Sequence, residues 1–231
     1  MSDAEHIHSR NVSYYDHIAG QYDSLLNKDG SNELIREKVA QRFRESICNG
    51  LVLDFGGGTG RDLDWLTEYN KVIFCEPSAG MREVALRNHH QNASVVFLDE
   101  PKTDFKKWDR ALPFPEKVDA VLCNFAVLNS IPDISFLFGN LSLIMKPGAH
   151  LFALILDNRR EKLIQQSRRK AIGSLIFHVP FTFYVYSGTH KQAVYLHTDR
   201  SLKKAASPFF EYRAKETWKE YGFCLTHFVK K

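Results

Sequence analysis

Five residues between positions 54 and 60 have the types and spacing of a tight ligand-binding turn: Asp54, Gly56, Gly57, Gly58 and Gly60. They follow the apolar run LVLDF and precede the helical segment RDLDWLTEYN. Glycines adopt positive φ and have no Cβ, so the backbone can turn closely against a ligand. The order strand, turn and helix therefore predicts a binding site at this turn.

The glycine spacing excludes two common phosphate-binding loops. A P-loop needs a lysine after its last glycine, and none follows here. The dinucleotide fingerprint GxGxxG, started at Gly56, fails at its third glycine because that position is Arg61. The pattern that fits is DxGxGxG. Its acid, Asp54, favours a cationic ligand and would repel a pyrophosphate.

The DxGxGxG pattern resembles the first motif of class I S-adenosylmethionine-dependent methyltransferases. The segment LPFPEKVDAVLCNFAVLNSIPD is similar to the fourth-strand region of that family, and LSLIMKPGAHLFALI to the segment through its fifth strand. SYYDHIAGQYDSL resembles the N-terminal helix of small-molecule members, the group that includes ubiquinone and menaquinone biosynthesis enzymes. The resemblance extends from about Tyr14 to Leu156 and implies S-adenosylmethionine as cofactor and S-adenosylhomocysteine as product.

The resemblance also assigns cofactor contacts. Asp54 would accept a hydrogen bond from the cofactor ammonium directly or through water, and Glu76, about 20 residues beyond the loop, would hold both ribose hydroxyls. Asp99 would accept from the adenine amino group, with Asp109 as the alternative. The predicted cofactor-binding residues are Asp54, Gly56, Gly57, Gly58, Gly60, Glu76, Pro77, Met81, Asp99, Asn124, Phe125, Tyr15 and Tyr22.

A catalytic base is not evident from the sequence. Many relatives have one or two histidines where this chain has Asn129 and Ser130. An oxygen nucleophile of high pKa would profit from a base. The candidates are His17, His178, His190 and His197, of which His197 is preferred because it ends an apolar run. Much of the rate of methyl transfer can come from alignment and exclusion of water, so no catalytic residue is required.

The elements that position these residues alternate between apolar strands and helices. This alternation predicts an α/β fold, and the resemblance implies a Rossmann-like, doubly wound, seven-stranded and mostly parallel sheet with an antiparallel C-terminal strand. We expect a flexible end over 1–12 and a single methyltransferase domain over 13–231. Its parts are an N-terminal helical cover (13–48), a cofactor-binding core (51–157), a substrate-cover insertion (158–200) and C-terminal strands (201–231).

The expected insertion contains a basic segment, RREKLIQQSRRK, and then two aromatic runs around Ser187 and Gly188 that predict a hairpin. The aromatic residues favour a hydrophobic or aromatic small-molecule pocket, and core packing is the alternative. The expected C-terminal strands are 209–213 and 223–229, with a short helix between them that Gly222 ends. The basic segment favours an anionic substrate or is a solvated helix face.

Composition narrows the class of protein. The 231 residues are 44% hydrophobic and 25% charged with a net charge of +4, which is typical of a globular chain and too weakly basic to indicate a nucleic-acid binder. No apolar run approaches the about 18 residues of a membrane span, and the polar start is unlike a secretory signal. We therefore expect a cytoplasmic location. The four cysteines form no CxxC pair, so no metal site is predicted.

The sequence thus predicts an enzyme that transfers a methyl group from S-adenosylmethionine to a small-molecule acceptor by in-line displacement at an oxygen, nitrogen or carbon nucleophile. Two alternatives stay open: methylation of RNA or protein, and a cofactor-binding partner protein without turnover. The acceptor, the methylated atom, the pathway and the oligomeric state are not predicted.

Overall fold

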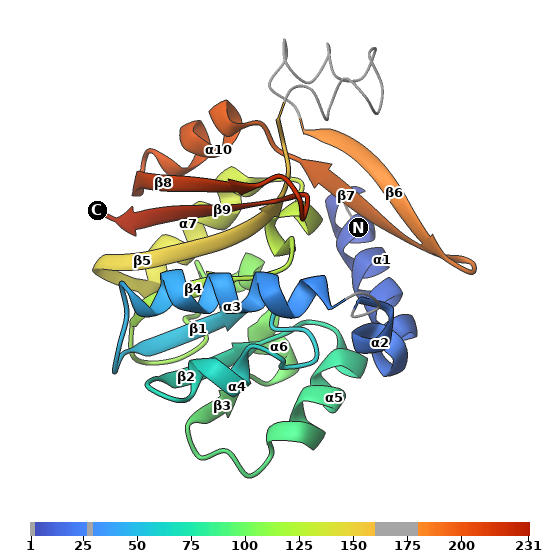
Figure 1. Ribbon diagram of the computed structural model, residues 1–231, viewed down its shortest axis with the longest axis horizontal. Coiled ribbons are helices and arrows are strands. Elements are labelled where there is room, and N and C mark those ends of the chain that lie inside the picture. Colours follow the sequence, from blue (N-terminus) through green and yellow to red (C-terminus); the bar gives the residue numbers. More distant parts are fainter. Residues whose placement is uncertain (1–2, 27–29, 160–179) are drawn as a thin grey trace.

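The computed structural model describes residues 3–26, 30–159 and 180–231. Within them, seven strands form one sheet in the order β3-β2-β1-β4-β5-β9-β8, and two more form a separate hairpin, β6-β7. Only β9 runs antiparallel to its neighbours β5 and β8. The predicted mostly parallel sheet with an antiparallel C-terminal strand is therefore confirmed (Figure 1).

The strands are β1 (Leu51–Phe55), β2 (Lys71–Cys75), β3 (Val95–Phe97), β4 (Val118–Cys123), β5 (Met145–Leu156), β6 (Phe181–Ser187), β7 (His190–Leu196), β8 (Phe210–Trp218) and β9 (Phe223–Lys230). The helices are α1 (Asp3–Ile18), α2 (Tyr22–Leu26), α3 (Ser31–Arg44), α4 (Leu63–Leu66), α5 (Ala79–His89), α6 (Glu100–Thr103), α7 (Ile134–Ile144) and α10 (Asp199–Ala206). Short 3-10 turns are η1 (Ala19–Gln21), η2 (Phe105–Lys107) and η3 (Val127–Ser130).

Both faces of the large sheet are covered, which explains why its central strands are apolar along their length. On one face, α3 and α4 pack through residues such as Phe43 and Leu66 against Val52 and Leu122. On the other face, α7 and α10 enclose a second apolar cluster that includes Phe138. The parallel strands are thereby held rigidly, and the residues at their carboxyl ends have fixed positions.

The sheet reverses its winding between β1 and β4, which are neighbours in space although β2 and β3 come between them in the chain. In doubly wound folds, ligands bind in the crevice outside the carboxyl ends of the strands at such a point. The residues that follow both strands have positive φ: Gly56 (75°) after β1, and Phe125 (45°) and Ala126 (66°) after β4. These turns place the glycine loop and the segment after β4 on either side of the crevice.

An amino-terminal helix lies across this end of the sheet, beside β7 (Figure 1). The predicted flexible end over 1–12 is wrong, because α1 already begins at Asp3 and Asn11 is buried. The Asn11 amide accepts from the backbone N–H of Ala193 at 2.8 Å and donates to its carbonyl at 3.1 Å. One side chain thus satisfies both backbone groups of a residue in β7.

A second contact joins α1 to α5. Asp16 Oδ1 accepts from Ser78 Oγ at 2.6 Å and from the backbone N–H of Gly80 at 3.0 Å. A Cβ on Gly80 would lie 3.1 Å from the Cβ of Ala19 and 3.2 Å from the carbonyl oxygen of Asp16. Glycine at this position therefore permits the close approach of the two helices.

The predicted hairpin is confirmed as β6 and β7, with Gly188 at φ 57° in the turn. The expected helix between the last two strands is wrong, because β8 continues to Trp218 and a short turn ending at Gly222 leads directly into β9. Residues 201–206 belong to α10 instead of a strand. Most of the basic segment, with Phe177 and His178, lies outside the described residues.

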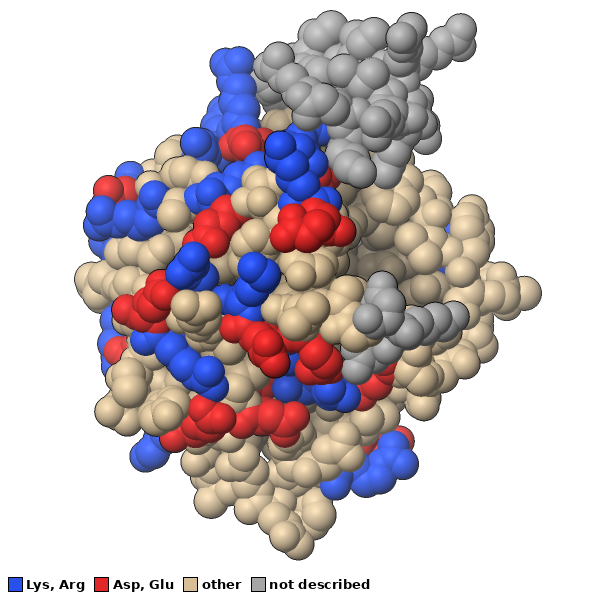
Figure 2. All heavy atoms as spheres, viewed as in Figure 1, with Lys and Arg blue, Asp and Glu red and all other residues tan. Residues whose placement is uncertain are grey.

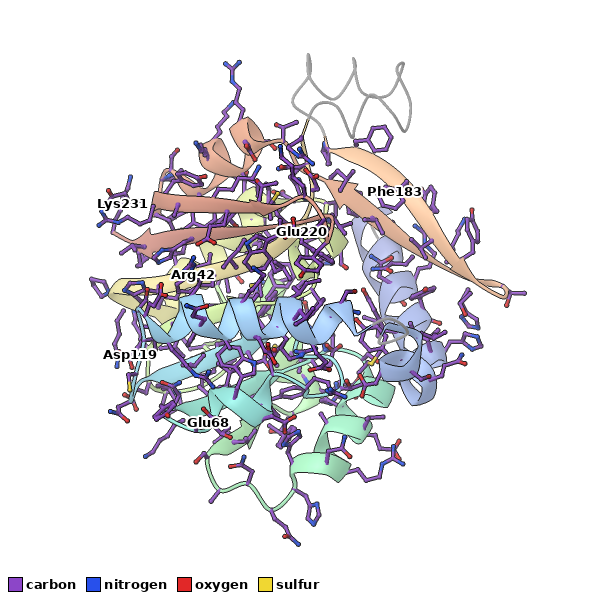
Figure 3. All side chains as sticks on the ribbon, in the orientation of Figure 1. Arg42, Glu68, Asp119, Phe183, Glu220 and Lys231 are labelled. Carbon is purple, nitrogen blue, oxygen red and sulfur yellow. The ribbon has the colours of Figure 1, made fainter. Side chains whose placement is uncertain are left out.

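The opposite end of the sheet has a purely structural polar contact. Asp119, at the left in Figure 3, accepts from the backbone N–H of Leu51 and from Lys146 Nζ, both at 2.9 Å. Burial alone would raise the pKa of Asp119, but these two donors outweigh it and lower the pKa. Asp119 therefore joins β1, β4 and the start of β5 far from the crevice.

No helix among the described residues is long and apolar enough to cross a membrane.

We predict that Asn11→Ala lowers the free energy of unfolding by about 1–3 kcal/mol, because it leaves the backbone groups of Ala193 buried without partners. Urea unfolding followed by circular dichroism measures this change. Asn88→Ala, at an exposed position on α5, is the control and should change stability little. Equal stability of the two variants would show that Asn11 does not anchor α1.

Candidate functional site

A single pocket occupies the crevice at the carboxyl ends of β1 and β4 within the described part of the chain. Its walls come from α1, α2, α3, the glycine loop, the ends of β2 and β4, η2 and η3. The lining residues are Asn11, Val12, Tyr15, Tyr22, Asp23, Asn32, Glu33, Arg36, Phe55, Gly56, Gly57, Gly58, Thr59, Arg61, Asp62, Glu76, Pro77, Met81, Thr103, Phe105, Asn124, Phe125, Val127, Ser130 and Ile131.

Most predicted cofactor contacts meet here although they are far apart in sequence. Those that line the pocket are Gly56, Gly57, Gly58, Glu76, Pro77, Met81, Asn124, Phe125, Tyr15 and Tyr22. Gly60 does not line it. A Cβ at Gly60 would approach Ala85 to 3.0 Å, so this glycine, at φ 83°, serves the packing of the loop against α5.

Asp54 lies beneath the glycine loop and outside the pocket lining. Its side chain is buried, and neither carboxylate oxygen accepts a hydrogen bond from any described protein group. A Cβ on Gly57 would collide with the Asp54 carboxylate and the Phe74 ring, so only glycine fits above it. Burial, and secondarily the nearby Asp62, raise the pKa of Asp54 well above its usual range. A cationic donor at the loop would remove this penalty.

Glu76, at the end of β2, is held by the loop itself. Its Oε2 accepts from the backbone N–H of Gly58 at 3.0 Å, and its Oε1 accepts from that of Ser78 at 2.8 Å. Burial raises the pKa of Glu76 to about 7, although both hydrogen bonds oppose the shift. Each oxygen retains a lone pair for a donor in the pocket. The arrangement fits a ligand with two adjacent hydroxyl groups.

A buried ion pair that sequence reasoning missed stands on the other side of the loop. Arg36 of α3 pairs with Asp62, which also accepts from Asn124 Nδ2 at 3.0 Å and from Trp65 Nε1 at 2.9 Å. The Arg36 guanidinium lies 4.7 Å from the centre of the Phe125 ring. Burial would lower the pKa of Arg36, but the attraction of Asp62 outweighs it. The one signal in the sequence was a cation directly beside Ile35, an apolar residue that the structure buries in α3.

Neither acid proposed for the adenine group reaches the pocket. The Asp99 side chain is 78% exposed and lies 3.4 Å from Lys102 Nζ, and Asp109 is also exposed. The chain turns into α6 immediately after β3, so Leu98 faces the core and Asp99 faces outward. The prediction for Asp99 is therefore wrong in this structure. Thr103 and Phe105 line the corresponding wall of the pocket.

The preferred base, His197, is also wrongly predicted. It is buried outside the pocket lining, with Nε2 2.9 Å from the carbonyl oxygen of Ile131. Burial lowers its pKa to about 4, so the ring stays neutral. His17 and His190 stack on each other with ring centres 4.2 Å apart, again outside the lining. His178 lies outside the described residues.

Asn129 and Ser130, the last two residues of η3, have different roles. Asn129 donates to the carbonyl oxygen of Tyr195 at 2.7 Å and accepts from the backbone N–H of Leu156 at 2.9 Å, so it joins η3 to β7 and β5. Ser130 lines the pocket.

The described residues contain no group of three or more His, Cys, Asp or Glu side chains that could hold a metal ion.

The comparison with protein families identifies the family to which this chain belongs. Residues 27–207 match the model of a methyltransferase domain. The chain belongs to this methyltransferase family. Membership confirms the predicted enzyme class, while the ubiquinone and menaquinone group is not singled out.

Solved structures of methyltransferases have the same fold. A complex titled DhpI-SAM-HEP is 18% identical, covers 100% of both chains and has a TM-score of 0.73. The N-methyltransferase NodS from Bradyrhizobium japonicum WM9, solved with S-adenosylhomocysteine, is 11% identical, covers 89% of this chain and 90% of its own, and has a TM-score of 0.61. No curated protein matches the chain in sequence.

We predict that Asp62→Ala lowers the free energy of unfolding by about 3 kcal/mol, because it leaves the buried Arg36 guanidinium without its counter-ion. Chemical denaturation measures the effect. Asp64→Ala removes an exposed acid from the same helix and is the matched control. If both variants lose the same small amount, the pair with Arg36 does not stabilise the site.

Proposed function

We propose that the protein transfers a methyl group from S-adenosylmethionine to a small-molecule acceptor. The observation that carries the proposal is the pairing of two buried acids around one glycine loop. Asp54 has no donor among the described residues, and Glu76 presents two carboxylate oxygens to the pocket. The first acid suits a cationic amine and the second suits a ribose diol, and S-adenosylmethionine carries both groups.

The remaining pocket residues fit the rest of this cofactor. Arg36 provides a cation for a carboxylate beside the glycine loop, and Met81, which packs beneath the N-terminal helices, offers an apolar contact for the adenine ring. Thr59 of the loop donates to Asp23 of α2 at 2.7 Å, which holds the cover against the loop. When bound, the cofactor supplies an electrophilic methyl group on sulfur. The protein aligns the nucleophile and excludes water.

A small acceptor is supported by the cover over the crevice. Asn11, Val12 and Tyr15 of α1 line the same pocket as Val127 and Ile131 after β4. The helix is attached to β7 and α5, so it covers the acceptor end of the pocket. On the face seen in Figure 2, acidic and basic side chains are intermixed, unlike the single-sign surface that favours nucleic acid.

The function is tested first by calorimetric titration with S-adenosylhomocysteine, with NADH and ATP as controls. We expect selective micromolar binding. Methyl-labelled S-adenosylmethionine is then incubated with the enzyme and with either the small-molecule fraction or the RNA and protein fraction of a cell extract. Label in the small-molecule fraction supports the proposal, whereas label only in macromolecules contradicts it. Cofactor binding without transfer to either fraction would indicate a binding protein.

We predict that the affinity for S-adenosylhomocysteine falls as the pH decreases below about 7. The pKa of Glu76 is about 7 in the protein without ligand. Donation by two ribose hydroxyls stabilises the ionised form and lowers this pKa in the complex. Binding below pH 7 therefore releases a proton, and affinity decreases towards about tenfold per pH unit.

Calorimetry between about pH 6 and pH 8, in buffers of different ionisation enthalpy, measures the proton release. Glu76→Gln should bind more weakly, by about tenfold or more at the higher pH, because it loses a charge-assisted hydrogen-bond acceptor. Its affinity should depend less steeply on pH in this range, because Asp54, whose pKa is also raised, would then be the remaining acid of the site. An unchanged pH dependence in Glu76→Gln would assign the titration to another group.

A further inference from the structure

Two hydroxyl groups share one donor at the wall of the pocket. Tyr15 of α1 and Ser130 of η3 both line the pocket. Nε2 of Gln192, on β7, donates to Tyr15 Oη at 2.7 Å and to Ser130 Oγ at 3.1 Å. The Gln192 side chain is buried behind them, at 8% exposure. One amide group therefore sets the hydrogen-bonding direction of both hydroxyls.

The direction follows from the number of donors and acceptors. An amide NH₂ group has two hydrogens and accepts none, so each hydroxyl must receive one of them. Each hydroxyl then keeps its own hydrogen. At least one O–H hydrogen of the pair is left to donate to a ligand in the pocket.

The described surroundings of the pair contain few titratable groups, although the Tyr22 ring lies 6.1 Å from that of Tyr15. Near it the pocket is lined by Val12, Val127 and Ile131. The described lining contains no His, Lys or Cys. The acids of the lining have partners of their own: Asp23 with Thr59, Glu33 with Arg61 and Asp62 with Arg36. Glu76 is held by the loop backbone and keeps its remaining lone pairs for the cofactor ribose in the proposed function. Burial raises the pKa of Tyr15, so its hydroxyl keeps the proton and remains a donor.

We propose that the Tyr15–Ser130 pair binds an oxygen atom of the methyl acceptor, and that Gln192 is the positioning residue that makes both hydroxyls donors. The acceptor class is an apolar molecule with a hydrogen-bond-accepting oxygen: a carboxylate, a phenolate or a carbonyl. A protonated amine cannot accept these O–H hydrogens and is left with the one remaining lone pair on each hydroxyl, so it fits this wall less well. The proposal rests on the proposed function, because it places the acceptor in the cofactor pocket.

The test uses matched ring compounds on protein saturated with S-adenosylhomocysteine. Benzoate and acetophenone carry an accepting oxygen, and benzylamine carries a protonated amine on the same ring. Ligand-observed NMR titration gives their dissociation constants. We expect benzoate and acetophenone to bind more tightly than benzylamine. Tyr15→Phe and Ser130→Ala should each weaken binding of the two oxygen compounds by about three- to tenfold and leave benzylamine unchanged.

Gln192→Glu provides the sharper variant, because it keeps the shape and turns the shared donor into a shared acceptor. Both hydroxyls would then donate to the new carboxylate and present lone pairs to the pocket. We expect the preference to reverse towards benzylamine. Gln91→Glu adds the same charge at an exposed surface position and should leave the preference unchanged.

Each outcome decides the proposal. Benzylamine binding as well as benzoate and acetophenone, failure of all three compounds to bind, or an unaltered preference in Gln192→Glu would overturn it. Circular dichroism and the affinity for S-adenosylhomocysteine, measured on every variant, show whether the fold and the cofactor end are intact. Loss of S-adenosylhomocysteine binding by the unmodified protein would instead contradict the proposed function.

Discussion

The site is arranged around the carboxylate of Asp54, which is buried and receives no hydrogen bond from the residues that the structure describes. A charge in such a place is costly, and two features of the chain leave space and donors for a ligand that would offset the cost. Gly57 leaves room above the carboxylate where any side chain would collide with it or with Phe74. The second acid nearby, Asp62, is fully occupied by Arg36, Asn124 and Trp65, so it does not claim the same donors. The two acids have separate roles: Asp62 stabilises the fold, and Asp54 is left for a ligand.

The glycine loop does not stand alone, because the N-terminal cover is attached to it. Thr59 bonds Asp23 of α2, and Arg61 pairs with Glu33 of α3. Further along, Asp16 attaches α1 to the start of α5. The helices that roof the acceptor end are thus joined to the loop and strand ends of the cofactor end. Because packed elements transmit strain, a displacement of the N-terminal helices would also displace the glycine loop, and the reverse.

The sequence predicted well wherever a local pattern implies a local structure. Apolar runs identified β1, which ends before a glycine, β2, which ends before an acid, and β4, and the order of strands and helices predicted the sheet. Contacts that depend on how distant segments meet were not predictable. Arg36 reaches Asp62 only because α3 crosses the end of β1, and Asp99 turns outward only because α6 starts at once after β3. The first twelve residues lack apolar periodicity, yet Asn11 is held in place by the backbone of β7, which a helical pattern does not reveal.

The segment after β4 shows how the pocket manages without a histidine. Asn129 is committed to structure, since its amide joins η3 to β5 and β7. Ser130, the next residue, faces the pocket beside Tyr15. The chain therefore has a polar wall made of neutral donors in the place where a base would stand. Donors of this kind orient a nucleophile and stabilise its charge but remove no proton, so under the proposed function we expect an acceptor that already has an available lone pair at neutral pH. For such an acceptor, alignment with the methyl group is the main task left to the protein.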